Sequence, residues 1–500
     1  MDIFLDGEGA IYQQLVRGLK NAIATGRLVD GERLPPSRDL CRQLGISRTT
    51  VVAAYELLRA EGYTNTVTGS GSYVSKNRVA KDRGNHLQST IPPQNERSRI
   101  ARSIFDLKGL PGRRPDEVKH AFEYGQPLQN KTMDALWAKE LRKAIARSSN
   151  RYPRVQGNPE LRSALAHHIE RSRGIVCDAD DILIVGGVQQ AIQVCIQALL
   201  NAGDEVAFEE PGYFGARSLF QIAGAKIVPV PVDRDGMIVE QIPPGVQLIY
   251  VTPSHQFPTG AVLSEARRAA LLEYARRTEA WVIEDDYDGE FRINGPAMHS
   301  LHASDRHGRT IYVGTLSKSF SAAVRLGYIV APPALHQDLL AAKWCLDFGS
   351  PALEQMALTG LVQSGAYARH LRWVSEELLN RRTALSSELM ARFGTTTSFA
   401  VPRSGMHLLA WFKGLGADAG AMLVRRCHQE GLGVYTVDSC YVRQPEALGL
   451  VLGFSTMSVT DIREAMGILE HVMSPLLRNP GSNAAQAENV IPLKRLVGRN

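Results

Sequence analysis

The chain has 500 residues, of which 44% are hydrophobic and 22% charged; this composition is typical of soluble globular proteins, and the length exceeds one ordinary domain. Its net charge of +6 does not by itself indicate nucleic-acid binding, and its six cysteines show neither CxxC nor metal-ligand spacing. We therefore expect reduced thiols, no metal site and a cytoplasmic location. The sequence has no apolar signal segment and no run near the ~18 apolar residues that would span a membrane.

The first part of the chain predicts three helices followed by a hairpin. Residues 11–25 place apolar side chains on one helical face, and Ser37 is a good N-cap for a second helix that ends near Leu44. Ser47 caps a third helix, and residues 63–75 alternate around a Gly-Ser-Gly turn, as a β-hairpin does. This order predicts a winged helix-turn-helix.

The stretch GERLPPSRDLCRQLGISRTTVVAAYELLRAEGY (31–63) and the SGS wing after it closely resemble the winged-helix domain of GntR-type regulators. The resemblance implies that residues 1–76 bind a double-stranded DNA operator. The physics agrees, because helix N-termini bind phosphates, arginine pairs with guanine, and glycines let a wing approach the minor groove. Which arginine contacts bases stays open, as does the alternative that this fold makes protein contacts. The candidate DNA-binding residues are Arg38, Ser47, Arg48, Thr49, Thr50, Gly69 and Gly71.

A basic segment follows this domain. Residues 76–114 hold ten Lys or Arg against three Asp or Glu, and residues 77–115 lack apolar periodicity. We interpret 77–115 as an interdomain linker. Its charge leaves two alternatives open, which are contact with DNA phosphates and simple solvation.

From residue 116 to 475, short apolar runs alternate with helical stretches, which predicts an α/β domain with a mostly parallel sheet. Two of its strands carry chemically useful residues, in WVIEDDYDGEF (281–291) and YVGTLSKSFSAAVRLGYIV (312–330). An aspartate and a tyrosine followed by a lysine and an arginine are the groups that a pyridoxal 5′-phosphate (PLP) site needs. Residues 476–500 predict a disordered tail.

This domain resembles fold-type I aminotransferases. TPSHQFPTG (252–260) and EDDYDGEF (284–291) resemble in particular the MocR/GabR-type subgroup of GntR regulators, and the resemblance covers nearly the whole chain. It implies that Lys318 forms the internal aldimine with PLP. It also implies that Asp285, rather than Asp286 on the opposite face of the strand, lies under the pyridine nitrogen, and that Tyr287 donates to the phenolic oxygen of the cofactor.

The same resemblance implies further contacts to PLP. The segment around Gly186 and Gly187 passes from a strand into a helix, whose N-terminus is a natural anion site. The neighbouring subunit would contribute a tyrosine to each phosphate, which makes the protein a homodimer. The candidates are Val188, Gln189, Thr315, Ser317 and Arg325 for the phosphate, Tyr213 for stacking on the ring, and Tyr152 for the phosphate of the neighbouring subunit.

Two departures from the enzyme pattern bear on function. Phe257 stands where catalytic aminotransferases carry an asparagine, so His255 is the nearest polar candidate for the cofactor's phenolic oxygen. The last predicted strand, 448–457, has no arginine for a substrate carboxylate. Arg217 and Arg443 are the candidate effector-binding residues; otherwise the effector lacks an α-carboxylate, or PLP itself is the effector.

These features favour a PLP-dependent transcriptional regulator that senses an amine or amino-acid-like effector through aldimine chemistry and moves its core relative to the DNA-binding domains. Weak residual transamination is compatible with this role. The linker is long enough to allow a domain-swapped dimer. One alternative is a working aminotransferase with an accessory N-terminal domain, and another is a sensor of PLP concentration.

Overall fold

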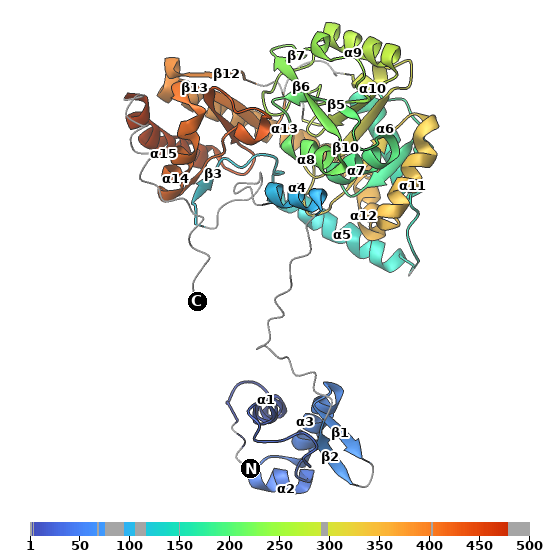
Figure 1. Ribbon diagram of the computed structural model, residues 1–500, viewed down its shortest axis with the longest axis vertical. Helices are drawn as coiled ribbons and strands as arrows, with labels where there is room; N and C mark the ends of the chain where they lie inside the picture. The colour runs from blue at the N-terminus through green and yellow to red at the C-terminus, as the bar shows by residue number, and fades with distance from the viewer. Residues whose placement is uncertain are drawn as a thin grey trace. The chain divides into compact units, whose positions relative to one another are not determined.

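The computed structural model describes residues 3, 5–67, 70–75, 95–105, 117–149, 151–291, 299–401 and 404–478. The chain divides into two compact units, residues 1–93 and residues 94–500 (Figure 1). Some sequence predictions lie outside the described residues. These are the contact at Gly69, the linker segments 77–94 and 106–115, and the tail from 479 to 500.

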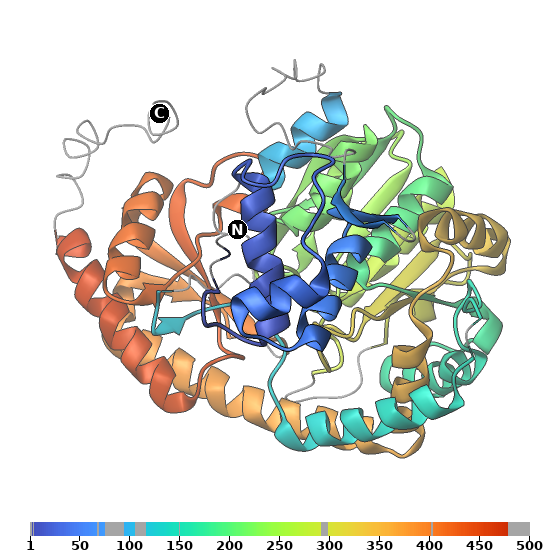
Figure 2. The ribbon, with the colours of Figure 1, turned by 90° about the horizontal axis from the view of Figure 1, so that it is seen from below.

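The first unit is a winged helix-turn-helix, which confirms the prediction. Its elements are α1 (Ile11–Ala24), α2 (Ser37–Leu44), α3 (Arg48–Ala60), β1 (Thr64–Val67) and β2 (Gly71–Val74), drawn in blue in Figure 2. Leu19, Val51 and Leu58 are fully buried in one core, because apolar residues recur on the inner faces of the helices. Ser37 is the first helical residue and not the N-cap, since Pro36 occupies the capping position.

An eight-stranded sheet forms the centre of the second unit, in the order β4-β11-β10-β9-β8-β5-β6-β7. Strands β10, β9, β8, β5 and β6 run parallel, while β11, β4 and β7 pair antiparallel with their neighbours. Every residue of β4, β8, β10 and β11 is buried, which explains the continuous apolar runs in the sequence. The strands are β4 (Ile182–Val185), β5 (Glu205–Glu210), β6 (Lys226–Asp233), β7 (Gly236–Met237), β8 (Leu248–Val251), β9 (Trp281–Asp286), β10 (Thr310–Thr315) and β11 (Gly327–Val330).

Helices cover both faces of this sheet, because alternate strand residues point into opposite layers. Phe208 and Ile283 pack with α7, α8 and α11, whereas Ala207 and Val282 pack with α9 and α10 on the other face. The helices of this part are α5 (Lys131–Arg147), α6 (Pro159–Arg173), α7 (Val188–Leu199), α8 (Phe214–Ala223), α9 (Glu265–Thr278), α10 (Leu301–Ser304), α11 (His336–Asp347) and α12 (Ala352–Gln363).

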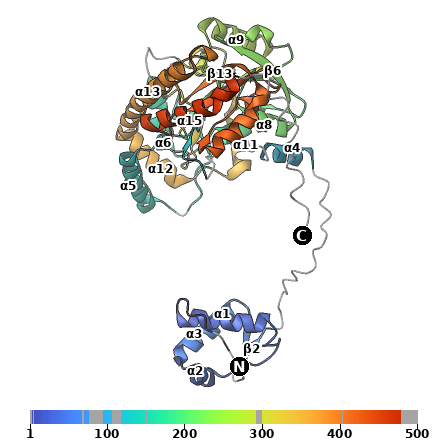
Figure 3. The same cartoon turned by 90° about the vertical axis from the view of Figure 1, so that its left-hand side faces the viewer.

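The C-terminal part forms a smaller subdomain around the antiparallel sheet β12-β13-β15. Helices α13 and α15 pack against each other beside β13 (Figure 3). A short parallel pair joins β14 to β3, which brings residues near 120 into this subdomain. Its elements are β3 (His120–Ala121), α13 (Ala366–Phe393), β12 (Thr397–Phe399), β13 (His407–Gly416), α14 (Gly420–Gln429), β14 (Leu432–Gly433), β15 (Ala447–Gly453) and α15 (Val459–Arg478).

The structure departs from the sequence prediction at two places. Helix α4 (Glu96–Phe105) lies inside the predicted linker and packs against α8. Helix α15 continues through Pro475 to Arg478, so its end falls within the predicted tail, and Leu476 is buried. Among the described helices, none is long and apolar enough to cross a membrane.

A buried ion pair joins α6 to the sheet and predicts a measurable stability effect. Arg173 Nε lies 2.7 Å from Asp286 Oδ2, and both side chains are at most 2% exposed. Replacing Arg173 by leucine leaves the buried carboxylate uncompensated, so we expect a loss of about 3–5 kcal/mol in unfolding free energy, measured by urea denaturation. The control Arg171→Leu changes an exposed residue of the same helix and should stay within about 0.5 kcal/mol of wild type. Equal stabilities for the two variants would contradict the prediction.

Candidate functional site

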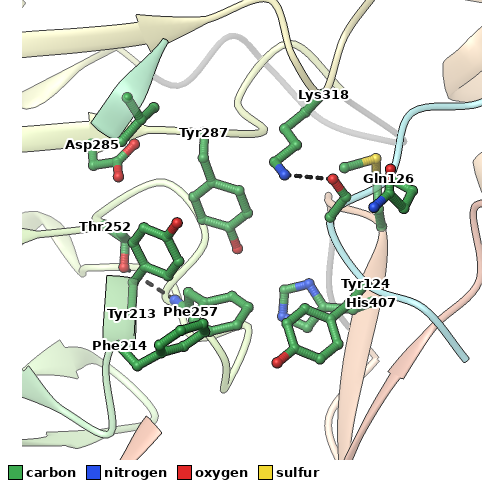
Figure 4. Close-up of a pocket in the computed structure, with 13 residues that line it drawn as sticks. Tyr124, Gln126, Tyr213, Phe214, Thr252, Phe257, Asp285, Tyr287, Lys318 and His407 are labelled. Carbon is green, nitrogen blue, oxygen red and sulfur yellow. Dashed lines mark hydrogen bonds between the residues drawn. The ribbon is translucent and has the colours of Figure 1, made fainter. Parts of the chain in front are cut away.

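A cavity of about 160 Å³ opens where β8, β9 and β10 end, between the large sheet and the C-terminal subdomain (Figure 4). The carboxyl ends of parallel strands are where open α/β sheets bind ligands. The lining residues are Tyr124, Gly125, Gln126, Val188, Tyr213, Phe214, Thr252, Phe257, Asp285, Tyr287, Lys318, Met406 and His407.

Lys318 enters the cavity from the turn that follows β10 (Figure 4). Its Nζ donates a hydrogen bond to the carbonyl of Gly125. Burial lowers the pKa of Lys318 below 10.5; the charge of Asp285 opposes this effect and that of Arg325 adds to it. A lower pKa gives the amine a larger neutral fraction, which is the form that attacks an aldehyde.

Asp285 brings a carboxylate from β9 to the cavity. Its Oδ2 accepts a hydrogen bond from Tyr250, while its Oδ1 is buried without a hydrogen-bond partner among the described residues. Burial raises the pKa of Asp285 to about 7. Asp286 points to the opposite face of the strand, as alternation predicts, and pairs there with Arg173. The protonated pyridine nitrogen of a PLP molecule placed at Oδ1 would stabilise the ionised carboxylate.

Strand ends and a helix start meet beside Lys318. Thr315 of β10 pairs with Gly327 of β11, which in turn pairs with Val185 of β4. Helix α7 begins three residues after β4, at Val188. The backbone N–H groups of this helix start therefore lie at the same edge as the end of β10, where they can bind an anion.

Polar side chains complete this edge. The Ser317 Oγ is buried and has no hydrogen-bond partner in the described part of the chain. The Arg325 Nη2 donates to the carbonyl of Gly186 at 3.1 Å, and the Gln189 Nε2 donates to the hydroxyl of Tyr213 at 2.9 Å. A hydroxyl, a guanidinium and helix N–H groups together form a suitable site for a phosphate.

Aromatic rings form one wall of the cavity, with Phe257 beside Tyr213 and with Tyr124 and His407 across from it (Figure 4). The Phe257 ring lies 5.6 Å from Tyr124, 5.2 Å from His407 and 5.9 Å from Tyr213, measured between centroids. Burial lowers the pKa of His407 well below 6.5, so its imidazole is neutral. This half of the cavity suits an apolar or aromatic ring.

In the first unit, the start of α3 is polar and exposed. The Ser47 Oγ accepts a hydrogen bond from the Thr50 N–H at 3.1 Å and lies 2.8 Å from the Thr49 hydroxyl, so it caps the helix as predicted. Arg48 and Arg38 are exposed, and neither forms an ion pair within the described residues. Both guanidinium groups are therefore available to DNA.

In the wing, the packing requires glycine at position 71. Gly71 has a φ of +124°, and a Cβ there would lie 3.0 Å from Arg33 Nε, so glycine lets the two strands of the wing pack against this arginine.

Comparison with known proteins accounts for both units. Residues 11–74 match the family described as bacterial regulatory proteins of the gntR family, and residues 121–467 match aminotransferase class I and II. A probable rhizopine catabolism regulatory protein, MocR of Rhizobium meliloti, is 31% identical over 93% of this chain and 94% of its own. The chain belongs to the MocR-type subgroup of GntR-family regulators. The pyridoxine biosynthesis transcriptional regulator PdxR of Corynebacterium glutamicum is also 31% identical, over 93% of this chain and 96% of its own.

Solved structures confirm the fold of the larger unit of this MocR-type regulator. An archaeal alanine:glyoxylate aminotransferase superposes with a TM-score of 0.67 at 25% identity, covering 76% of this chain and 95% of its own. The larger unit therefore has the fold of aminotransferases of class I and II, a fold associated with PLP.

The structure gathers many of the predicted MocR-type site residues and separates others. Lys318, Asp285, Tyr287, Tyr213 and Val188 line the cavity, and Gln189 contacts Tyr213 from the start of α7. The predicted phosphate contacts Thr315, Ser317 and Arg325 lie at or after the adjoining strand ends.

Gln189, Thr315, Ser317 and Arg325 border the cavity without lining it, and four further predicted residues lie away from it. His255 is fully buried one layer behind it, with Nδ1 bonded to Asp288 and Tyr287. Arg217 Nη2 donates to the Ser439 carbonyl at 2.7 Å. The side chain of Arg443 is exposed, and its backbone N–H donates to Glu210. Tyr152 is 90% exposed and lies beside Phe348. Each therefore needs a role other than direct contact in this chain's own cavity.

Several lining residues were not predicted from the sequence. Tyr124, Met406 and His407 come from segments far from the recognised motifs, so nothing in their local pattern indicates the cavity. Tyr250 does not line the cavity, but it was also missed, because it lies in a buried apolar strand; its hydroxyl donates to Asp285. Thr252 lies within TPSHQFPTG, and its hydroxyl donates to Glu209 at 2.6 Å.

Proposed function

We propose that this protein is a transcriptional regulator that binds PLP at Lys318, senses a small amine or amino-acid-like effector there, and responds by changing how its winged-helix units bind operator DNA. The observation that carries the proposal is the convergence of Lys318 and Asp285 on one cavity, in a chain whose other unit is a GntR-type domain. A DNA-binding unit fused to a reactive small-molecule site is the arrangement that a ligand-controlled regulator requires.

The cavity fits PLP on grounds of chemistry. Bound PLP supplies an aldehyde that reacts with amines and a ring that draws electrons when its nitrogen is protonated. Lys318 offers the amine, and the free Oδ1 of Asp285 offers a partner for that nitrogen. Ser317 and the start of α7 would hold the phosphate, with Arg325 as its cation. Tyr213 would cover one face of the ring.

A homodimer is part of this proposal. Tyr152 is 90% exposed and its ring lies 6.3 Å from that of Phe348, which is itself 53% exposed. Exposed aromatic side chains that contact one another are typical of protein interfaces. We expect Tyr152 to reach the phosphate bound by the neighbouring subunit, and two winged-helix units on one dimer would bind a two-part operator.

A route for the signal is also available within the larger unit. Tyr213, which lines the cavity, directly precedes α8, and α8 packs against α4. Arg217 of α8 is bonded to the Ser439 carbonyl of the C-terminal subdomain. A ligand that moves Tyr213 or this subdomain therefore acts on α4, the element where the linker from the DNA-binding unit enters the fold.

The alternative function, a working aminotransferase, is less favoured because Phe257 contributes no hydrogen bond from its side chain where the enzymes have an asparagine. A direct test scans the visible absorbance of the purified protein against a panel of amines and measures turnover with amino donors and keto acids. We expect spectral changes with particular amines and turnover far below the ordinary range of about 1–10³ per second. Turnover within that range would support the enzyme. A DNA affinity that changes with PLP alone, and with no amine tested, would support a sensor of PLP.

A further inference from the structure

A buried polar cluster lies directly behind the cavity and is not used by the function proposed so far. His255 Nδ1 lies 2.6 Å from Asp288 Oδ2 and 2.9 Å from the hydroxyl of Tyr287, and the His255 and Asp288 side chains are 0% and 2% exposed. Of the three, only Tyr287 lines the cavity. Burying a histidine and a carboxylate costs folding free energy unless the two groups hydrogen-bond to each other.

The packing around the cluster holds it in one arrangement. Gly405 has a φ of +89°, and a Cβ there would lie 2.2 Å from His255 Cε1 and 2.6 Å from Asp288 Oδ2. The ring of His407 lies 5.1 Å from that of His255. Glycine is therefore required at 405, because it allows the backbone of the C-terminal subdomain to close directly over the cluster.

The hydrogen positions follow from the partners. A carboxylate has no hydrogen to donate, so the short contact between Asp288 Oδ2 and His255 Nδ1 places the hydrogen on Nδ1. That hydrogen also faces the Tyr287 oxygen, which therefore accepts, so the hydrogen of the Tyr287 hydroxyl goes to Asp288 or to an acceptor in the cavity. Burial and the charge of Asp288 raise the pKa of Tyr287 well above 10, so the phenol keeps its hydrogen.

We propose that Asp288 and His255 are positioning residues that orient the Tyr287 hydroxyl as a hydrogen-bond donor toward the phenolic oxygen of bound PLP. This rests on the proposed function, because it assumes that PLP occupies the cavity. The relay would replace the donor that is lost where Phe257 stands. The Phe257 ring itself packs beside Tyr287, with 6.1 Å between the two ring centroids.

The test is a double-mutant cycle read through the absorbance of bound PLP as a function of pH. A donor to the phenolic oxygen favours its ionised form, so Tyr287→Phe should raise the apparent pKa of the bound chromophore by about one unit. Asp288→Asn should shift it in the same direction. In the Tyr287→Phe background, Asp288→Asn should add no further shift, because the relay acts only through the tyrosine. The other ionisable groups facing Tyr287 are Asp285, Glu209 and His407, and they are unchanged throughout.

Controls separate this proposal from a structural effect and from failure of the proposed function. Asp338→Asn changes an exposed aspartate of α11 and should titrate like wild type. If Asp288→Asn does not fold, as judged by thermal unfolding without PLP, His255→Asn takes its place in the cycle. Equal shifts in both backgrounds, or no shift on Asp288→Asn, would overturn the relay while PLP binding stands. A wild-type protein without visible absorbance in the presence of PLP would overturn the proposed function as well.

Discussion

Replacing Arg48 by alanine is expected to abolish specific operator binding while the PLP absorbance stays unchanged. Arg48 is exposed at the first position of α3, where the Ser47 cap holds the helix start. A bidentate pair between arginine and guanine contributes about 1–3 kcal/mol of discrimination, and a dimer loses that amount twice. We therefore expect operator affinity to fall by at least about 30-fold, measured by fluorescence anisotropy with labelled operator at fixed salt.

Two comparison variants make this result specific. Arg425→Ala removes an exposed arginine of α14 in the other unit and should leave operator affinity unchanged. Arg38→Ala distinguishes the two candidate arginines, because loss of a phosphate contact weakens all sequences alike and lowers the salt slope by about one per subunit. Wild-type operator affinity in Arg48→Ala would mean that a different surface recognises the DNA sequence.

Much of the fold was predictable because local signals and tertiary structure agree. The helix in 11–25, the Ser47 cap and the hairpin in 63–75 each follow from spacing or capping chemistry, and the structure has all three. The parallel sheet was predictable because its buried strands are continuous apolar runs. Helix α4 was not, since the described part of this helix has a single half-buried apolar residue, Ile100, among exposed charged and small residues. Helix α4 packs against α8, a tertiary contact that the local sequence pattern does not reveal.

The site was predictable where side chains share a strand and unpredictable where they meet across the fold. Strand alternation placed Asp285 at the cavity and Asp286 on the opposite face. His255 was expected to contact the cofactor because it is two residues from Phe257. The structure instead turns it toward Asp288, a choice that depends on how the backbone folds between 252 and 258 and on the approach of Gly405. Sequence separation carries no information about such contacts.

Replacing Lys318 by alanine is expected to leave operator binding intact and to abolish the response to the effector. Lys318 is the only lysine among the residues that line the cavity, and burial lowers its pKa, so it is the amine that can bond covalently to PLP and be displaced by an effector amine. An effector shifts an equilibrium only by its differential affinity for the two states. Without the lysine, binding an amine no longer breaks a bond to the protein, and this difference is lost. We expect the ratio of operator affinities with and without the amine to fall to about one, a change of up to about 5–150-fold in regulators of typical coupling.

Borohydride reduction provides the chemical control for this variant. In wild-type protein, reduction should fix the cofactor on the peptide that contains Lys318, detected by mass spectrometry; in Lys318→Ala, PLP should remain removable by dialysis. Lys139→Ala, at an exposed position of α5, should behave like wild type in both assays. A Lys318→Ala protein that still responds to the amine would show that sensing needs only binding in the aromatic half of the cavity. In that case the rings of Tyr124, Phe257 and His407, rather than the covalent bond, would distinguish the two states of the regulator.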